Sequence, residues 1–237
     1  MKNSLARVNG MQHIGLAVSD MNKFLPLYRK LFGLDIPFFD SVQPAPLMDV
    51  YTHQKTITKR ASMVLNLQGG CAIEVIQTTS FQPRPNLGVF EWGDIGINYI
   101  HFKSRDVHHA HTHAKACVDL VKDIHARPDD RPAFYLQDPD GNWFQVTADD
   151  RWYTNSGHPI GGVMGCAIGV SNIEASMKLY ADVLGFDQVV YDTTGEFEEW
   201  KTLPGGQATF RRVLLQPSKP AGGGFAKVTG INHIELI

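Results

Sequence analysis

The stretch AVSDMNKFLPLYRKLFGLDIPFFD, residues 17–40, decides the fold, because the chain contains a second version of it. The second version is GVSNIEASMKLYADVLGFDQVVYD, residues 169–192, and the two align without a gap at an offset of 152 residues. Tyr28 falls on Tyr180 in this alignment. Repetition at a fixed spacing indicates a chain built from copies of one structural unit.

Composition excludes several classes of protein. The chain has 237 residues, 43% of them hydrophobic and 19% charged, which is typical of a globular protein with a core. Its net charge of -2 gives no electrostatic reason to bind nucleic acid or an anionic membrane. No apolar run is long enough to span a bilayer, and the N-terminus lacks the apolar region of a signal peptide. The cysteines, Cys71, Cys117 and Cys166, are widely spaced, so we expect reduced thiols in a cytoplasmic protein.

The first unit, residues 1–80, predicts the order βαβββ. MQHIGLAVSD reads as a strand that runs into a helix N-cap at Asp20, and Gly33 ends the helix. Pro26 is tolerated in a helix near its first turn. IPFFD, RASMVLNLQGG and CAIEVIQ predict three further strands, with Gly69-Gly70 as a hairpin turn between the last two.

Two further units follow, residues 81–150 and residues 151–237. The second has a strand IGINYIHFKS, a helix HHAHTHAKACVDLV capped by Asp106, and strands FYLQ and WFQVTAD joined by a DPDGN turn. The third has MGCAIGVSN, a helix ending at Gly185, and strands VVYD, FRRVLLQ and NHIELI. QPRPNLGVFEWGD and DDRWYTNSGHPIGG link the units, and SKPAGGG predicts a mobile loop.

These motifs, in this order and repeated, resemble the vicinal oxygen chelate superfamily, which includes glyoxalase I, bleomycin-resistance proteins and extradiol dioxygenases. The resemblance implies an α+β fold in which tandem βαβββ modules pair into a half-open, strongly curved, barrel-like mixed sheet with helices outside. We expect module 2 to pair with module 1 and module 3 to lack its partner. An unpaired module 3 indicates either a truncated chain or a homodimer through module 3.

The resemblance also implies a divalent metal, held by His on the first strand and Glu on the fourth strand of the modules. In module 1 these positions are His13 and Glu74. In module 2 they are Tyr99 and Gln145, so neither standard ligand is present. His101 lies two residues beyond Tyr99 and therefore on the same face of its strand. Metal ligands His13, His101 and Glu74 would suit Fe(II), Zn, Mn or Ni.

Such an ion accepts two neighbouring oxygens of a small-molecule substrate and acts as a Lewis acid. Lys103 shares the face of His101, so we expect Tyr99, Gln145 and Lys103 to contact substrate as catalytic residues. A base separate from the metal ligand Glu74 would be His101 or Tyr99. The sequence thus predicts a lyase, isomerase or dioxygenase.

Other interpretations stay open. His13 would then be a hydrogen-bonded structural residue, and Glu74 would pair with Lys103 or an arginine instead of a metal. Tyr99 and Trp143 would line a metal-free cavity that sequesters a small apolar ligand, as in the bleomycin-resistance branch. A third possibility is a noncatalytic component that pairs with another chain.

Two histidine pairs are weaker candidates. His109 and His113 have metal-ligand spacing on a helix, but no third ligand accompanies them, which favours a solvated helix face. His233 and Glu235 share one side of a strand and would be half of a second site. Gly165 occupies the matching first-strand position, so we expect His233 and Glu235 to be structural.

Overall fold

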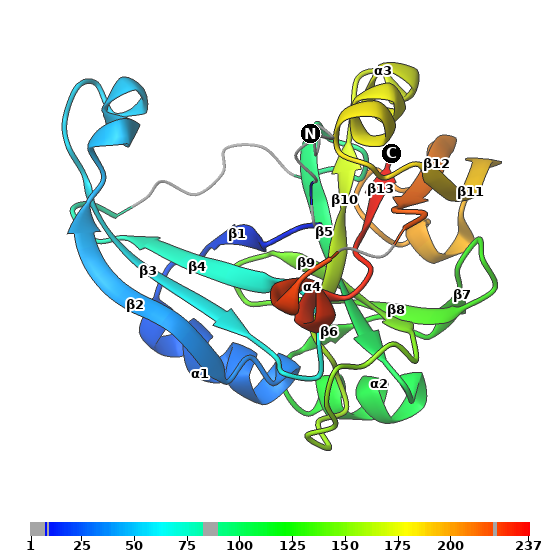
Figure 1. The fold of residues 1–237 in the computed structure, drawn as a ribbon, viewed down its shortest axis with the longest axis horizontal. Helices are drawn as coiled ribbons and strands as arrows, with labels where there is room; N and C mark the ends of the chain where they lie inside the picture. Colours follow the sequence, from blue (N-terminus) through cyan, green and yellow to red (C-terminus); the bar gives the residue numbers. More distant parts are fainter. Residues whose placement is uncertain (1–7, 9, 83–89, 220–221) are drawn as a thin grey trace, which may run out of the picture.

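The computed structural model describes residues 8, 10–82, 90–219 and 222–237. It contains a four-stranded sheet of order β1-β4-β3-β2 and a nine-stranded sheet of order β11-β12-β13-β10-β5-β9-β8-β6, with β7 paired to β8 (Figure 1). Both sheets mix parallel and antiparallel strands, and neither closes into a barrel in the described part of the chain. No helix in these residues is long and apolar enough to cross a membrane.

Module 1 has the predicted order of elements. They are β1 (His13–Ala17), α1 (Met21–Phe32), β2 (Ile36–Pro44), the 3-10 helix η1 (Pro46–Tyr51), β3 (Thr58–Leu65) and β4 (Ala72–Thr78). The Asp20 side chain accepts a hydrogen bond from the backbone N–H of Asn22, and Gly33 ends the helix with φ 61°. Both predicted helix ends are confirmed; η1 was not predicted.

Module 2 differs from its prediction in the length of its helix. Its elements are β5 (Gly96–Ser104), α2 (Val107–Lys115), β6 (Leu120–Val121), β7 (His125–Ala126), β8 (Pro132–Gln137) and β9 (Trp143–Ala148). The predicted helix extends to residue 121, but Leu120 and Val121 instead pair with β8. Strand pairing therefore ends the helix early.

Module 3 contains β10 (Val163–Gly169), α3 (Ile173–Lys178), the π-helical turn η2 (Leu179–Val183), β11 (Gln188–Gly195), η3 (Glu198–Trp200), β12 (Phe210–Gln216), α4 (Gly224–Thr229) and β13 (His233–Leu236). Gly185 follows the helical segment with φ 77°, as predicted. Residues 220–221 of the predicted SKPAGGG loop, and residues 83–89 of the first linker, lie outside the described residues, and Gly224 already belongs to α4.

The internal repeat extends to individual contacts. Arg60 binds both carboxylate oxygens of Asp40 at 2.9 and 2.7 Å and reaches α1 at Asn22. Arg211 binds Asp192 at 2.8 Å through two nitrogens and reaches α3 at Glu174 in the same manner. Arg60 and Arg211 therefore occupy equivalent places in the third strands of modules 1 and 3.

The strand pairing differs from the expected one. First strands β5 of module 2 and β10 of module 3 pair antiparallel, so module 3 has a partner and its sheet continues into module 2. β1 ends the four-stranded sheet and pairs only with β4 among the described strands. The βαβββ pattern fixes the strands of each unit, but all units offer the same free first-strand edge, so the pattern does not select the partner.

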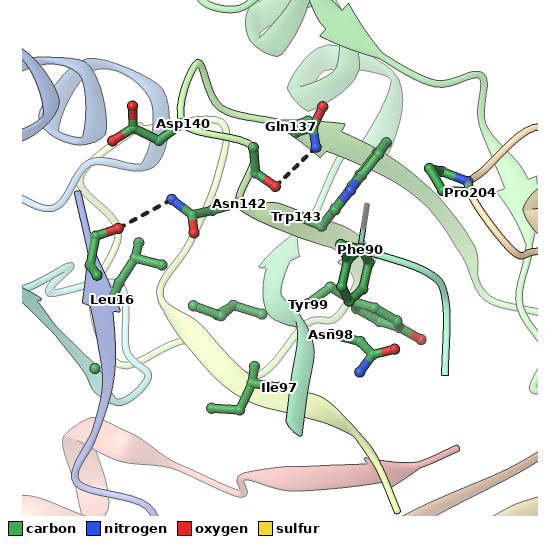
Figure 2. A pocket seen from close by; sticks show the side chains of 14 residues that line it. Leu16, Phe90, Ile97, Asn98, Tyr99, Gln137, Asp140, Asn142, Trp143 and Pro204 are labelled. Carbon is green, nitrogen blue, oxygen red and sulfur yellow. Dashed lines mark hydrogen bonds between the residues drawn. The ribbon is translucent and has the colours of Figure 1, made fainter. Parts of the chain in front are cut away.

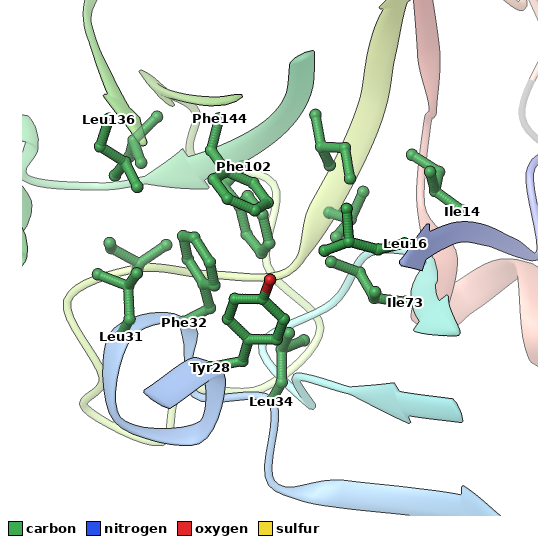
Figure 3. Packing of buried hydrophobic residues seen from close by; sticks show 14 of the residues in the cluster. Ile14, Leu16, Tyr28, Leu31, Phe32, Leu34, Ile73, Phe102, Leu136 and Phe144 are labelled. Carbon is green, nitrogen blue, oxygen red and sulfur yellow. The ribbon is translucent and has the colours of Figure 1, made fainter. Parts of the chain in front are cut away.

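Module 1 contacts module 2 through its helix. Phe32 of α1 stacks on Phe102 of β5, with ring centroids 4.0 Å apart, and lies 4.9 Å from the Phe144 ring of β9 (Figure 3). Ile14 and Ile73, from β1 and β4, complete the same core. Full burial of side chains of this size stabilises the fold by about 1.5–3 kcal/mol each, which ties the two sheets together.

Tyr28 adds a polar contact to this apolar core. Its hydroxyl donates to Asp138 Oδ2 at 2.6 Å, and the same carboxylate accepts from the backbone N–H groups of Asp140 and Asn142 in the predicted DPDGN turn. The bond therefore links α1 of module 1 to the β8–β9 turn of module 2.

We expect Tyr28→Phe to lower the free energy of unfolding by about 1–3 kcal/mol, because the buried carboxylate loses a donor. Tyr180→Phe is the matched control, since Tyr180 occupies the repeated position and the described residues give its hydroxyl no hydrogen-bond partner. That variant should stay within about 0.5 kcal/mol of the parent. Urea denaturation measures both; equal effects would show that the Tyr28 hydroxyl contributes nothing particular.

Candidate functional site

The structure brings His13 and Glu74 together. His13 Nε2 lies 3.4 Å from Glu74 Oε2, and Lys59 Nζ lies 3.9 Å from the other carboxylate oxygen. The side chains of His13 and Glu74 are 35% and 20% exposed. Their strand neighbours Ile14 and Ile73 point into the core, so alternation directs the pair to the opposite, open face of the four-stranded sheet.

His101 lies in a different environment. Its neighbours Ile100 and Phe102 belong to the same core as Ile14, the neighbour of His13. Side chains alternate along a strand, so His101 and His13 both point away from this core. His13 lies in the four-stranded sheet and His101 in the nine-stranded sheet. The His101 side chain is fully buried. The predicted set of His13, His101 and Glu74 is therefore not assembled within this chain.

His101 instead contributes to a buried polar cluster, which we call the cup, on the inner face of the nine-stranded sheet. It comprises Tyr99, His101, Arg127, Gln145, Tyr191, Arg212, His233 and Glu235. His101 Nδ1 lies 2.6 Å from His233 Nε2, and His101 Nε2 lies 3.5 Å from Glu235 Oε2. Tyr99 stacks on His101 with ring centroids 5.0 Å apart.

Glu235 is the centre of the cup. Its Oε1 accepts from Arg212 Nε at 2.7 Å and from the Tyr191 hydroxyl at 2.7 Å, while Oε2 accepts from the Tyr99 hydroxyl at 2.8 Å. Both Glu235 and Arg212 are fully buried. A buried carboxylate needs such partners, because an unpaired ion in the interior is strongly unfavourable.

Burial and neighbouring charges set the ionisation of the cup. Burial opposes ionisation of Glu235, but Arg212 and Arg127 outweigh it and hold the pKa of Glu235 below its usual value. Burial, reinforced by Arg127, lowers the pKa of His101 well below its usual value, and burial does the same for His233. The two imidazoles are therefore neutral at pH 7.

The remaining predicted catalytic residues also belong to the nine-stranded sheet. Gln145 lies beside His101 in the sheet register and accepts from Arg127 Nη1 at 3.4 Å. Lys103 donates to the backbone carbonyl of Arg151. Burial lowers the pKa of Lys103 to about 8. None of these contacts joins Gln145 or Lys103 to the pair of His13 and Glu74.

A loop closes the cup over Arg212. The guanidinium carbon lies 4.6 Å from the Phe197 ring centroid and 4.2 Å from that of Trp200, and Nη1 donates to Glu199 at 2.7 Å. Trp200 in turn donates its indole N–H to the Tyr135 hydroxyl. The cation thus lies against both aromatic rings, whose centroids are 5.0 Å apart.

Sequence reasoning missed several members of the cup. They are Arg127, Tyr191 and Arg212, and it also missed Trp200, which packs against Arg212. A usable signal exists for Arg212: strand alternation in FRRVLLQ places one of its two arginines on the inward face. His233 and Glu235 were noted as a pair, and Gly165 explains why no ligand faces them from β10. A Cβ at Gly165 would collide with the carbonyl oxygen of His233.

The two candidate sites differ in their fit to a metal ion. Two ligands bound to one ion at about 2.0–2.2 Å lie roughly 3–3.5 Å apart, which the 3.4 Å separation of His13 Nε2 and Glu74 Oε2 matches. In the cup, both oxygens of Glu235 are taken by other donors and Arg212 already supplies positive charge. Throughout the described residues no group of three or more His, Cys, Asp or Glu side chains is arranged to hold an ion.

A cleft of about 670 Å³ runs along the free edge of β1 (Figure 2). Apolar and aromatic side chains form much of its wall: Leu16, Phe90, Ile97, Tyr99 and Trp143. Asn98 and Asn142 add polar groups, and Asn142 Nδ2 lies 3.5 Å from the carbonyl oxygen of Ala17. The cleft therefore lies between β1 of module 1 and strands β5 and β9 of module 2.

The tandem βαβββ units and the open mixed sheets define the class of fold. The family model described as Glyoxalase/Bleomycin resistance protein/Dioxygenase superfamily matches residues 10–146. The chain belongs to this superfamily. No curated protein matches it in sequence.

Solved structures with the same fold are distant in sequence. A mutant of glyoxalase I from Zea mays superimposes with a TM-score of 0.55 and 15% identity, covering 95% of this chain and 68% of that one. Unmutated Zea mays glyoxalase I gives 0.52 and 16%, covering 95% and 66%. A Bacillus subtilis protein proposed to be a dioxygenase gives 0.61 and 13%, covering 98% and 64%. The chain thus spans about two thirds of their length.

We expect Glu235→Gln to lower the free energy of unfolding at pH 7 by about 3–5 kcal/mol, because it breaks a fully buried ion pair and leaves Arg212 with Glu199 alone as a carboxylate partner. The pKa of Glu235 is lowered in the folded state, so its ionised form stabilises the fold above the unfolded pKa of about 4.3. That contribution is lost as the pH falls through the folded pKa. The difference between variant and parent should therefore shrink towards pH 3.

Urea denaturation at pH 7 and at low pH measures this difference. The double variant Arg212→Met/Glu235→Gln is the control, since it removes both partners of the buried ion pair and should lose less than the sum of the two single changes. A Glu235→Gln protein within about 1 kcal/mol of the parent at pH 7 would contradict the prediction.

Proposed function

We propose that the three modules, with the bounds given above, form part of a divalent-metal enzyme of the glyoxalase or dioxygenase type, in which His13 and Glu74 hold the ion. The observation that carries this proposal is the 3.4 Å approach of His13 Nε2 to Glu74 Oε2 on an open sheet face. Bound there, a divalent ion supplies Lewis-acid chemistry to neighbouring oxygens of a small substrate.

The residues around the pair support this role. Lys59 lies within 4 Å of Glu74, so it is placed to offset carboxylate charge before an ion binds. Gly15 stands opposite Glu74 in the β1–β4 register and leaves the space beside the carboxylate open. Tyr99, Gln145 and Lys103 have contacts in another part of the fold, so we assign them no catalytic part in this site.

Two side-chain ligands are few for a stable site, and the fold suggests where others come from. β5 pairs antiparallel with the first strand of a second βαβββ unit. β1 has a corresponding edge: Val18 donates to Ile76 and Gln12 accepts from Ala72, which leaves the backbone groups of Gly15 and Ala17 directed away from β4. We propose that another βαβββ unit pairs there and contributes further ligands.

We expect protein purified without a histidine tag to carry divalent metal that depends on the pair. His13→Ala and Glu74→Ala should each lower metal affinity at least about 10-fold. Loss of a residue that only hydrogen-bonds to a metal ligand already lowers metal affinity by about that factor. His53→Ala, at an exposed histidine outside the sheets, is the matched control and should retain the metal. Elemental mass spectrometry after dialysis measures metal content, and full content in both variants would contradict the proposal.

The pairing of β1 gives a separate test. We expect metal to raise the molecular mass of the protein in light scattering if a second copy supplies the other unit, and EDTA to reverse the change. Ala17→Pro should abolish association while leaving the β1–β4 ladder intact, because proline is tolerated where a strand N–H faces outward. A monomeric mass both with metal and with EDTA would exclude a second copy as the partner of β1.

The cleft supports a second candidate function. Its volume of about 670 Å³ and its aromatic wall are suited to an apolar ligand, and Ile97 in that wall is 51% exposed. In this alternative the protein sequesters a ligand without metal. Binding of an apolar fluorescent probe that survives EDTA and His13→Ala, but is lost in Ile97→Asp, would favour it.

A further inference from the structure

We infer that Arg212 is a built-in cation that takes the place of a metal ion in the cup, so that the cup holds a latent His–Glu metal site blocked by one side chain. This inference concerns the cup alone and does not depend on the function proposed for His13 and Glu74. It follows from comparing the two His–Glu pairs of the chain.

The two pairs have nearly the same geometry. His101 Nε2 and Glu235 Oε2 are 3.5 Å apart in the cup, and His13 Nε2 and Glu74 Oε2 are 3.4 Å apart in module 1. The cup pair is fully buried, whereas the module 1 pair is partly exposed. Spacing alone therefore does not distinguish a site that accepts an ion from one that does not.

The cations beside the two carboxylates do distinguish them, because Glu74 has the partly exposed Lys59 with its Nζ 3.9 Å away, whereas Glu235 is bound by the buried Arg212. Arg212 Nε binds Glu235 Oε1 at 2.7 Å and has no exposed surface. Arg60 and Arg211 make equivalent contacts in modules 1 and 3, and the next residue is Ala61 in module 1 but Arg212 in module 3. At the same place in the unit, one module carries a methyl group and the other a guanidinium.

The rest of the cup is arranged around this cation. Trp200 and Phe197 lie against the guanidinium, and Glu199 binds its Nη1. Aromatic faces attract a cation through their quadrupole, and most strongly when water is excluded. Arg127 adds a second positive charge near Glu235. Arg127 Nε pairs with Asp129 at 3.3 Å, whereas Arg212 binds Glu235 itself, so a divalent ion entering the cup would be opposed chiefly by Arg212.

Removing the positive charge should expose the latent site. Arg212→Met keeps an unbranched apolar stem, removes the guanidinium and leaves Glu235 with Tyr99 and Tyr191 as donors. The measurement is a Co²⁺ titration followed by visible absorption, with folding of each variant checked by circular dichroism. All proteins carry Glu74→Ala, which silences the module 1 pair and leaves the cup as the reporter.

With Arg212 present, we expect no Co²⁺ absorption band. With Arg212→Met, we expect Co²⁺ to bind at least 10-fold more tightly and to produce a band that Glu235→Gln removes. Arg211→Met is the matched control, because Arg211 is the exposed neighbour paired to Asp192, and it should leave the cup without affinity for Co²⁺.

Two results would overturn the inference. One is Co²⁺ binding in the Glu74→Ala protein that is lost on Glu235→Gln, which would show that the cup accepts metal beside Arg212. The other is a folded Arg212→Met protein that binds no Co²⁺. If Arg212→Met does not fold, the Co²⁺ titration of the protein that retains Arg212 can still overturn the inference. Arg212→Gln then replaces Arg212→Met in the titration of the protein that lacks the arginine. The proposed metal site at His13 and Glu74 is tested separately, by measuring the metal content of proteins that retain Glu74.

Discussion

The pairing of β5 with β10 governs the rest of the structure. It places β5 in the interior of the nine-stranded sheet, with β10 on one edge and β9 on the other, so neither edge is free. Ile100 and Phe102 pack into the core with α1, and Tyr99 and His101 fill the cup from the opposite face. A polar group on that inner face has little access to water, so its partners must come from the protein.

This constraint explains the composition of the cup. Two arginines, a glutamate, two neutral histidines and several hydroxyl groups share hydrogen bonds in the interior, although Arg127 Nη2, Arg212 Nη2 and Gln145 Nε2 have no hydrogen-bond partner among the described residues. Such a cluster is a costly way to stabilise a core, because apolar residues of the same volume often serve as well or better. It is easier to understand as a metal-type pocket whose positive charge now comes from Arg212. Module 1 lacks that cation, and its His–Glu pair faces outward.

Local features of the fold could be predicted from the sequence because short-range chemistry determines them. Asp20 caps α1 and Gly33 ends it with a left-handed conformation, as their residue types require. Helix α2 was predicted too long, because tertiary pairing of Leu120 and Val121 with β8 outweighs local helical pattern. The order of elements in each unit needed no tertiary information, since periodicity and turn residues carry it.

The candidate site was predictable only within one unit. His13 and Glu74 lie on adjacent strands of module 1, so their approach follows from the unit itself. For His101, alternation predicts which residues of the strand share its face. It does not predict whether that face points towards module 1 or away from it. Its partner Glu235 comes from another module, through a pairing that identical free edges leave undetermined.

The two pairs consequently depend on different interactions. The pair in module 1 needs only the parallel contact between β1 and β4. The cup pair spans three strands, because His101 of β5 lies opposite Gly165 of β10, which in turn neighbours β13. Gly165 makes this possible, since any side chain there would collide with His233. An ion at His13 and Glu74 could thus be gained or lost without disturbing the cup, because α1 and the sheet of module 1 pack on the face of β5 that carries Ile100 and Phe102, and the cup lies on the opposite face.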